Sequence, residues 1–168
     1  EKELVLENGK VRVAVDRATG ELTSLRDKAT GQEYLAPGGR GNRLLFLEDD
    51  HPSMPAWSMR YTGRELDPGT LESIAVLEDG PLRQTIRTIR VVHLDPALPP
   101  TRIVQDIMLY DDSPLVIFKT YGDWYASRVT LKAAFDLALE WTSVAAEAPY
   151  AVVTRPAERA AGESVLDM

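Results

Sequence analysis

Acidic and imidazole side chains, which can bind cations or exchange protons, come together at one place in this sequence, Asp49-Asp50-His51. Pro52 and Pro55 follow directly and break the stretch, which is too polar to form a regular element. These surroundings favour a solvated acidic turn over a cation site. Trp57 lies in the same irregular stretch, where an aromatic ring needs something to pack on or to bind.

The remaining catalytic side-chain types do not form a recognisable set. The second histidine, His93, is remote from the first, and the chain has no cysteine. Because zinc needs three or four convergent ligands at set spacing, we predict no metal site in this chain. Motifs of serine hydrolases, zinc proteases, P-loop enzymes and dinucleotide-binding folds are absent. The chain has many carboxylates, so their number does not exclude a pair of catalytic acids of the kind that glycosidases use. No sequence motif distinguishes such a pair, and we predict no catalytic residue in this chain.

An acid beside a tryptophan, Asp123-Trp124, ends the longest block of strand-forming residues. Apolar residues on both alternating faces at the start of this block, from Leu115 to Phe118, predict a strand that is covered on both sides. Asp123 and Trp124 then lie where the strand emerges at a rim, a common place for binding residues. Aromatic rings beside acids suit sugar recognition. The alternative is that Trp124 anchors the core and Asp123 is a turn acid.

Composition limits the classes of function. The chain has 168 residues, a hydrophobic content of 44% and a formal net charge of -7. This acidic balance argues against nucleic-acid binding, which needs a basic surface. No apolar run is long enough to span a membrane, so a soluble protein is expected. The lack of cysteine does not decide the compartment, which stays open, with a cytoplasmic location favoured. The opening on strand-like sequence without methionine suggests a piece excised from a larger protein.

Short alternating segments separated by turns predict an all-β fold. The Asn8-Gly9 dipeptide between two β-rich runs is a strong hairpin signal. The strands are expected at 4–6, 11–15, 21–26, 32–35, 43–48, 70–77, 82–94, 101–110 and 149–156. Residues 1–168 are read as a single all-β domain in which 157–168 form a frayed tail.

The segment from 131 to 148 is ambiguous, because its alanine, leucine, lysine and glutamate content favours helix. Strict alternation also holds over its first half, and nothing else in the chain is helical in pattern. We therefore predict an extended run to Trp141, with the side chains of Leu131, Phe135, Leu137 and Leu139 buried.

Four stretches of the sequence, taken in order, resemble the C-terminal β-sandwich region of the α-mannosidases of glycoside hydrolase family 38. The quoted segments are LENGKVRVAVDRATGELTSLRDKATGQEYL, GNRLLFLEDD followed by AW, DSPLVIFKTYGDW followed by LKAAFDL, and APYAVVTRP. Their order and spacing agree from Leu4 to Pro156. The chain departs from the family pattern at Tyr125-Ala126, Asp136 and Ala151, which puts specific substrate contacts there in doubt.

This resemblance implies a galactose-mutarotase-like β-supersandwich and a strand at 131–141. It also implies a parent enzyme that hydrolyses α-mannosides with retention, with its zinc ion and aspartate nucleophile in a catalytic barrel and a helical region absent from this chain. The chain itself is then a non-catalytic domain that packs on the barrel. Asp123, Trp124 and Arg155 match the family's "DW" and "RP" positions and are our candidate substrate-binding residues.

Two other functions are weighed against this one. A free-standing carbohydrate-binding module would expose a ring of aromatic side chains, whereas an accessory domain would expose an apolar docking patch. An aldose epimerase of the same fold would need a general acid and base, commonly Glu and His, in one cleft. His51 and His93 have no surrounding motif of that kind.

Overall fold

The computed structural model describes residues 2–53, 59–140 and 142–156, and within them the regular elements are strands. The first six are β1 (Glu3–Glu7), β2 (Val11–Asp16), β3 (Leu22–Asp27), β4 (Arg43–Asp49), β5 (Tyr61–Leu66) and β6 (Thr70–Asp79). The others are β7 (Arg83–Val92), β8 (Thr101–Tyr110), β9 (Val116–Asp123), β10 (Val129–Ala134), β11 (Ser143–Ala148) and β12 (Ala151–Pro156). The all-β prediction is therefore confirmed. Trp57, Trp141 and the tail expected to be frayed lie outside the described residues.

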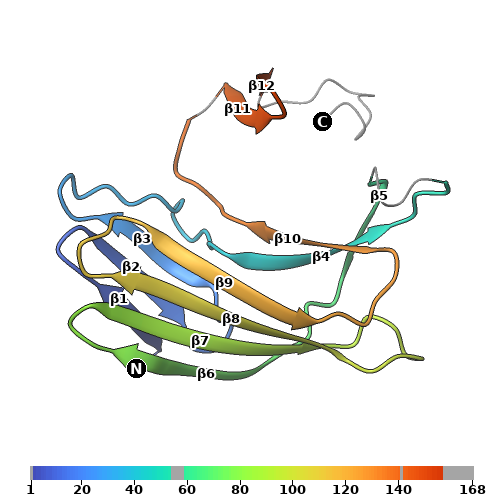
Figure 1. Cartoon of the computed structure of the whole chain (residues 1–168), viewed down its shortest axis with the longest axis horizontal. Helices are drawn as coiled ribbons and strands as arrows, with labels where there is room; N and C mark the ends of the chain where they lie inside the picture. Colours follow the sequence, from blue (N-terminus) through green and yellow to red (C-terminus); the bar gives the residue numbers. More distant parts are fainter. Residues whose placement is uncertain (1, 54–58, 141, 157–168) are drawn as a thin grey trace.

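The largest sheet is an antiparallel meander of four strands in the order β6-β7-β8-β9 (Figure 1). Each strand is rich in β-branched residues, and each pair is joined by a turn or loop that the sequence signals with glycine, proline or aspartate. β7 and β8 pair without a break from Arg83–Tyr110 to Val92–Thr101. β6 is an edge strand with two register shifts, a common device that discourages edge-to-edge association.

The second layer consists of two three-stranded sheets, in the orders β1-β2-β3 and β10-β4-β5. An isolated bridge between Leu22 and Gly41 links them. Both cover the same face of the four-stranded sheet, because Ile86 and Ile107 belong to the core cluster of β1–β3 while Val92 and Ile103 join Phe46 of β4 in a second cluster. Since strand residues alternate between faces, these partners all project from one side of β7 and β8. The result is a β-sandwich (Figure 1).

The other face of the four-stranded sheet has no covering layer among the described residues. The prediction that the strand before Asp123 is covered on both sides is therefore wrong. Leu115, Ile117 and Tyr121 are 65%, 39% and 47% exposed, respectively. Val116 and Phe118, on the other face of β9, do pack against the core.

The segment after β10 differs from its prediction in burial. The strand interpretation is confirmed as far as Ala134, and Leu137 continues it with a single bridge to Leu35. Leu131 packs against the core, but Phe135, Leu137 and Leu139 are 36%, 44% and 44% exposed. Alternation identified the extended backbone, but the layer needed to bury these three side chains is not formed by the described residues. β5 was not predicted, because its sequence YTGREL lacks an apolar face.

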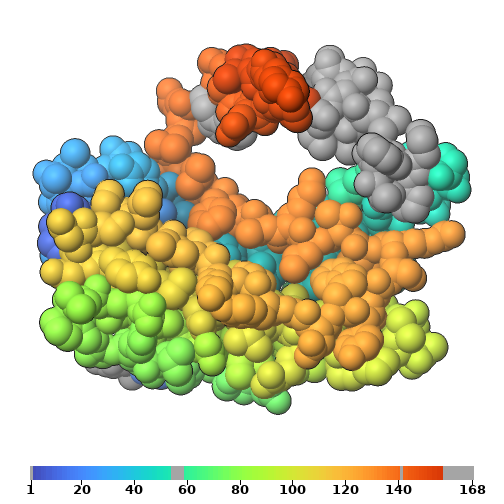
Figure 2. Space-filling model, in the orientation of Figure 1, coloured from blue at the N-terminus to red at the C-terminus, as the bar shows by residue number. Residues whose placement is uncertain are grey.

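β11 and β12 form a hairpin that pairs with no other strand of the described chain. The space-filling view shows this hairpin standing off the body of the sandwich (Figure 2). Val144, Tyr150 and Val152 are exposed on it. No helix in the described part of the chain is long and apolar enough to cross a membrane.

Candidate functional site

The three residues predicted to bind substrate lie at two places. Asp123 ends β9 opposite Arg102 and is exposed, and Trp124 follows it. Arg155 lies in β12 opposite Val144, on the separate hairpin, and is half-buried. The structure therefore brings Asp123 and Trp124 to one strand end and leaves Arg155 apart from them (Figure 1).

Trp124 has a structural role at this position. Its ring stacks on that of buried Phe46, with centroids 6.3 Å apart and an interplanar angle of 12°. Its indole Nε1–H donates to the carbonyl of Ala126 at 3.0 Å. The first contact closes the end of the second core cluster, and the hydrogen bond shapes the loop leading to β10. A role in substrate binding remains a proposal for all three residues.

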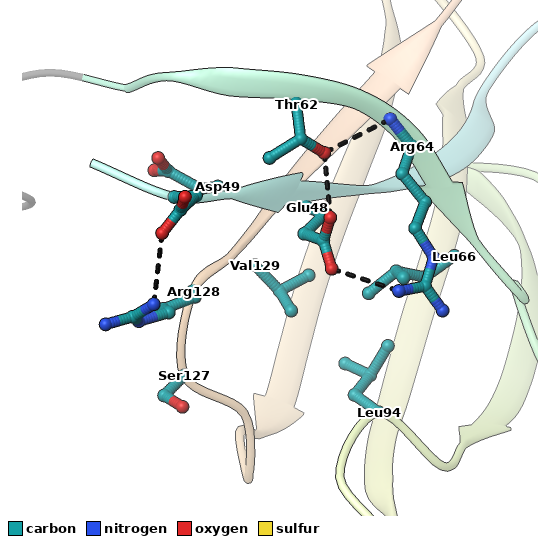
Figure 3. A pocket seen from close by; sticks show the side chains of 10 residues that line it. Glu48, Asp49, Thr62, Arg64, Leu66, Leu94, Ser127, Arg128 and Val129 are labelled. Atoms are coloured by element: carbon teal, nitrogen blue, oxygen red, sulfur yellow. Dashed lines mark hydrogen bonds and ion pairs between the residues drawn. The ribbon is translucent and has the colours of Figure 1, made fainter. Parts of the chain in front are cut away.

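A pocket of about 460 Å³ opens next to this loop, at the end of the space between the two layers. Its lining comes from the ends of β4, β5 and β10 and from the segment after β7, as Figure 3 shows. The lining residues are Glu48, Asp49, Asp50, Thr62, Arg64, Leu66, Leu94, Ser127, Arg128 and Val129. The volume lies within the range of ~300–1,000 Å³ that is typical of small-molecule sites.

The floor of the pocket is apolar. Leu66, Leu94 and Val129 form it, and each packs against the core cluster around Phe46. Glu48 faces the same side, since it lies two positions after Phe46 and opposite Val129 in the β4–β10 register. The pocket is therefore the point where the apolar core gives way to polar side chains at an open end of the sandwich.

One side of the rim is a hydrogen-bonded group centred on Glu48. Its carboxylate accepts a hydrogen bond from the Thr62 hydroxyl at 2.8 Å and another from Arg64 Nη1 at 3.1 Å (Figure 3). The Thr62 hydroxyl in turn accepts the backbone N–H of Arg64 at 3.3 Å. These bonds hold a carboxylate and a guanidinium in fixed positions above the floor.

The opposite side is built from Asp49 at the end of β4, from Asp50 directly after it, and from the loop before β10. Asp50 forms ion pairs with Arg60 and Arg128, both at 3.0 Å. Asp49 is buried and accepts the backbone N–H of Arg60 at 2.9 Å. Arg128 has a positive φ of 55°, unusual for a residue with a side chain, and its carbonyl accepts the backbone N–H of Asp49 at 2.8 Å.

The acidic cluster of the sequence therefore contributes to a pocket and to ion pairs. Among residues 2–53, 59–140 and 142–156, no three His, Cys, Asp or Glu side chains lie close enough together to hold a metal ion. The residues described here thus do not fit the zinc ion that the family resemblance implies for a parent enzyme. Sequence reasoning found Asp49 and Asp50 but missed Arg64 and Arg128, since only folding brings their strands together.

Two of the three arginines of β7 pair with acids on neighbouring strands. Arg83 donates to both oxygens of Glu78 at 2.6 Å, and Arg87 donates to both oxygens of Asp106 at 2.7 and 2.8 Å. The hydrogen bonds from Arg83 and Thr85 lower the pKa of Glu78 to about 2. Arg90 projects inward and donates to the Thr19 carbonyl. Because of these interactions, β7 presents little unpaired positive charge. That this chain does not bind random DNA stays a prediction.

The fold defines a β-sandwich domain with a polar pocket at one end. The sequence profile of the "Glycosyl hydrolases family 38 C-terminal domain" matches residues 6–164. The chain belongs to this family.

Two curated relatives agree with the family assignment, and one solved structure shares the fold. The chain is 30% identical over 156 residues to "Alpha-mannosidase 2C1" of Homo sapiens and, equally, to that of Mus musculus. Each alignment covers 91% of this chain and 14% of the relative, so the chain spans about a seventh of their length. An α-mannosidase from Enterococcus faecalis V583 shares the fold, with a TM-score of 0.71, 17% identity, and coverage of 92% of this chain and 20% of that one.

Proposed function

We propose that this chain is a non-catalytic domain of an α-mannosidase that hydrolyses α-mannosides with retention of configuration. The observation that carries the proposal is the family match over residues 6–164, in a chain that spans 14% of its curated relatives. In this proposal residues 1–168 form one domain of the larger protein. The mutarotase-like character of the sandwich stays a prediction.

The domain packs on the remainder of the enzyme through apolar side chains of its C-terminal half. Exposed large hydrophobic residues are frequent there: Leu115, Ile117, Tyr121, Trp124, Tyr125, Phe135, Leu137, Leu139, Val144, Tyr150 and Val152. A soluble domain gains by covering apolar surface of this extent. The catalytic barrel and the helical region supply the cover, together with the nucleophile and with the zinc ion, for which the described residues of this chain form no ligand group.

A free-standing carbohydrate-binding module is the second candidate. The pocket at the end of the sandwich favours it, because an apolar floor under a polar rim suits a sugar ring. Asp123, Trp124 and Arg155 serve in either proposal as rim residues that contact substrate.

Turnover of p-nitrophenyl-α-mannoside tests the first proposal. The isolated chain should show no turnover above the buffer rate, with or without added zinc. The longer protein should be active and should lose activity when residues 1–168 are deleted. Asp123→Ala in the longer protein should raise KM while leaving the melting temperature unchanged. Turnover by the isolated chain, or full activity of the deletion variant, would overturn the proposal.

A further inference from the structure

We propose that the pocket between β4, β5, β10 and the segment after β7 binds the ring of a neutral pyranoside sugar. The choice of a mannoside as its ligand rests on the proposed function, whereas the site itself rests on the geometry of this chain. Nothing in the family match or in the named relatives assigns a ligand to these residues.

The floor fits one face of a sugar ring. A pyranoside presents a patch of C–H groups on one side and hydroxyls around its edge. Leu66, Leu94 and Val129 offer an apolar surface that is still partly open to solvent, since they line the pocket and are only partly buried against the Phe46 cluster. Covering that surface with C–H groups removes apolar area from water without leaving a polar group unpaired.

The rim fits the hydroxyls. A sugar hydroxyl both donates and accepts, so it needs acceptors and donors side by side. Glu48 and Arg64 supply such a pair 3.1 Å apart on one side of the pocket, and Asp50 and Arg128 supply another 3.0 Å apart on the other side. Each guanidinium has further N–H groups beyond the one that its carboxylate accepts. Charged partners make stronger hydrogen bonds to hydroxyls than neutral ones do.

The charges of the lining favour a neutral ligand over an anion. Three acids, Glu48, Asp49 and Asp50, line the pocket together with Arg64 and Arg128. Arg60, which is not a lining residue, also pairs with Asp50 at 3.0 Å, so the positive and negative charges around the pocket balance. A sugar phosphate would have to approach three carboxylates, and a cation would meet two guanidinium groups already paired with those acids. A neutral polyhydroxyl compound avoids both penalties.

The pocket is held in shape before any ligand binds. Arg128 keeps a left-handed backbone conformation, with φ of 55°, because its carbonyl is tied to the Asp49 N–H. Strained conformations of non-glycine residues cluster at ligand sites, where the surrounding structure maintains them. The Trp124–Ala126 hydrogen bond fixes the preceding loop, which carries Ser127. A preformed rim lowers the ordering cost of binding.

A titration of the 168-residue chain with methyl α-mannoside, followed by amide chemical shifts, tests the proposal. Saturable shifts should be confined to residues 48–50, 62–66, 94 and 127–129, with a dissociation constant on the order of 1 mM for a ligand of this size. Mannose 6-phosphate is the comparison ligand and should bind more weakly. Absence of saturable shifts in a folded spectrum, or tighter binding of the phosphate, would overturn the proposal.

Two variants and one control locate the site. Arg128→Ala and Glu48→Gln should each weaken binding about tenfold or more, the effect of losing a charge-assisted hydrogen bond. Arg12→Ala removes a half-buried arginine that pairs with Glu7 at 3.6 Å, outside the pocket, and should leave binding unchanged. Melting temperatures report whether each variant is folded. Folded pocket variants that bind as well as the wild type would refute the assignment.

Failure of this inference is separable from failure of the proposed function. One outcome is that the chain binds no sugar while the longer protein still loses turnover when the domain is deleted. That result would refute the assignment of the pocket as a sugar site and support the role of the chain as an accessory domain. If the chain binds methyl α-mannoside through Arg128 and Glu48 but deletion of the domain leaves turnover unchanged, the sugar site is supported and the accessory role is refuted.

Discussion

The indole ring of Trp124 lies parallel to the ring of Phe46, with an interplanar angle of 12°. Phe46 is fully buried and Trp124 is 40% exposed, so the tryptophan acts as the outer cover of the second core cluster. The contact joins the end of β9 in one layer to β4 in the other. It is thus one of the contacts that close the sandwich at this end.

Trp124→Ala should lower the free energy of unfolding by about 2 kcal/mol, less than the ~3–5 kcal/mol of a fully buried aromatic residue because part of the ring is exposed. Trp124→Phe keeps a stacked ring and should lose about half as much. Urea unfolding monitored by circular dichroism measures both changes. A loss below about 0.5 kcal/mol for the alanine variant would show that the stacking contributes little.

Phe135 and Phe46 offer a matched comparison of two aromatic side chains. Phe135 is 36% exposed and makes an edge contact with Phe118 at 6.0 Å between centroids, whereas Phe46 is fully buried. Phe46→Ala should cost ~3–5 kcal/mol, and Phe135→Ala only about 1–2 kcal/mol. Equal losses in chemical denaturation would contradict the exposure of Phe135 in the isolated chain.

The same comparison shows where the sequence was informative. Alternation and turn residues predicted most strands, including the whole of β8 and the hairpin at Asn8-Gly9. Burial of Phe135 and Leu137 could not be predicted in the same way, because it depends on a second layer and not on local pattern. Alternation says which side chains share a face, but it does not say whether that face is covered.

The pocket was harder to predict than the fold. Glu48 and Val129 meet because β4 and β10 pair, although about 80 residues separate them in sequence. Arg64 belongs to β5, whose residues lack the apolar alternation that marks a strand. The sequence feature that pointed to the pocket was Asp49-Asp50, an acidic pair directly after a predicted buried strand. It indicated where polar side chains gather but not which residues of β5 and β10 lie opposite them.

The Glu78–Arg83 pair should make stability depend on pH in the acidic range. The pKa of Glu78 is lowered from 4.5 to about 2 in the folded chain, chiefly by the hydrogen bond from Arg83. A carboxyl with a lowered folded-state pKa stabilises the fold above its unfolded pKa, and this contribution is lost as the pH falls. The wild type should thus exceed Glu78→Gln in stability above about pH 4.5, with the difference disappearing toward pH 2.

Thermal unfolding of both proteins between pH 2 and pH 7 measures this difference. Arg83→Met should reproduce the effect of Glu78→Gln, and the double variant should add little to either, because one interaction is removed in all three. A constant stability gap across the whole pH range would contradict the pKa assignment.

Gly69 should tolerate no side chain. It has a φ of 70°, and an added Cβ would overlap the Val91 carbonyl and lie 2.8 Å from the Val92 Cα, both in the backbone of β7. Gly69→Ala should therefore lower the free energy of unfolding by at least about 3 kcal/mol, or prevent folding. Gly38→Ala is the control, since φ there is 75° but no atom lies within 4 Å, and it should cost only about 1 kcal/mol. Similar melting temperatures for both variants would show that the β5–β6 connection can shift away from β7.

The pairing of β4 with β10 has a consequence for the order in which the chain folds. β6 to β9 are joined by short connections and can form as successive hairpins, each with a small entropic cost of loop closure. β4 can pair early with β5, but its pairing with β10 must form later, since Val129 meets Glu48 only after the intervening strands have brought the two segments together. The long-range sheet, and with it the pocket mouth, is thus expected to assemble last, so refolding should show its slowest protection from hydrogen exchange in β4 and β10.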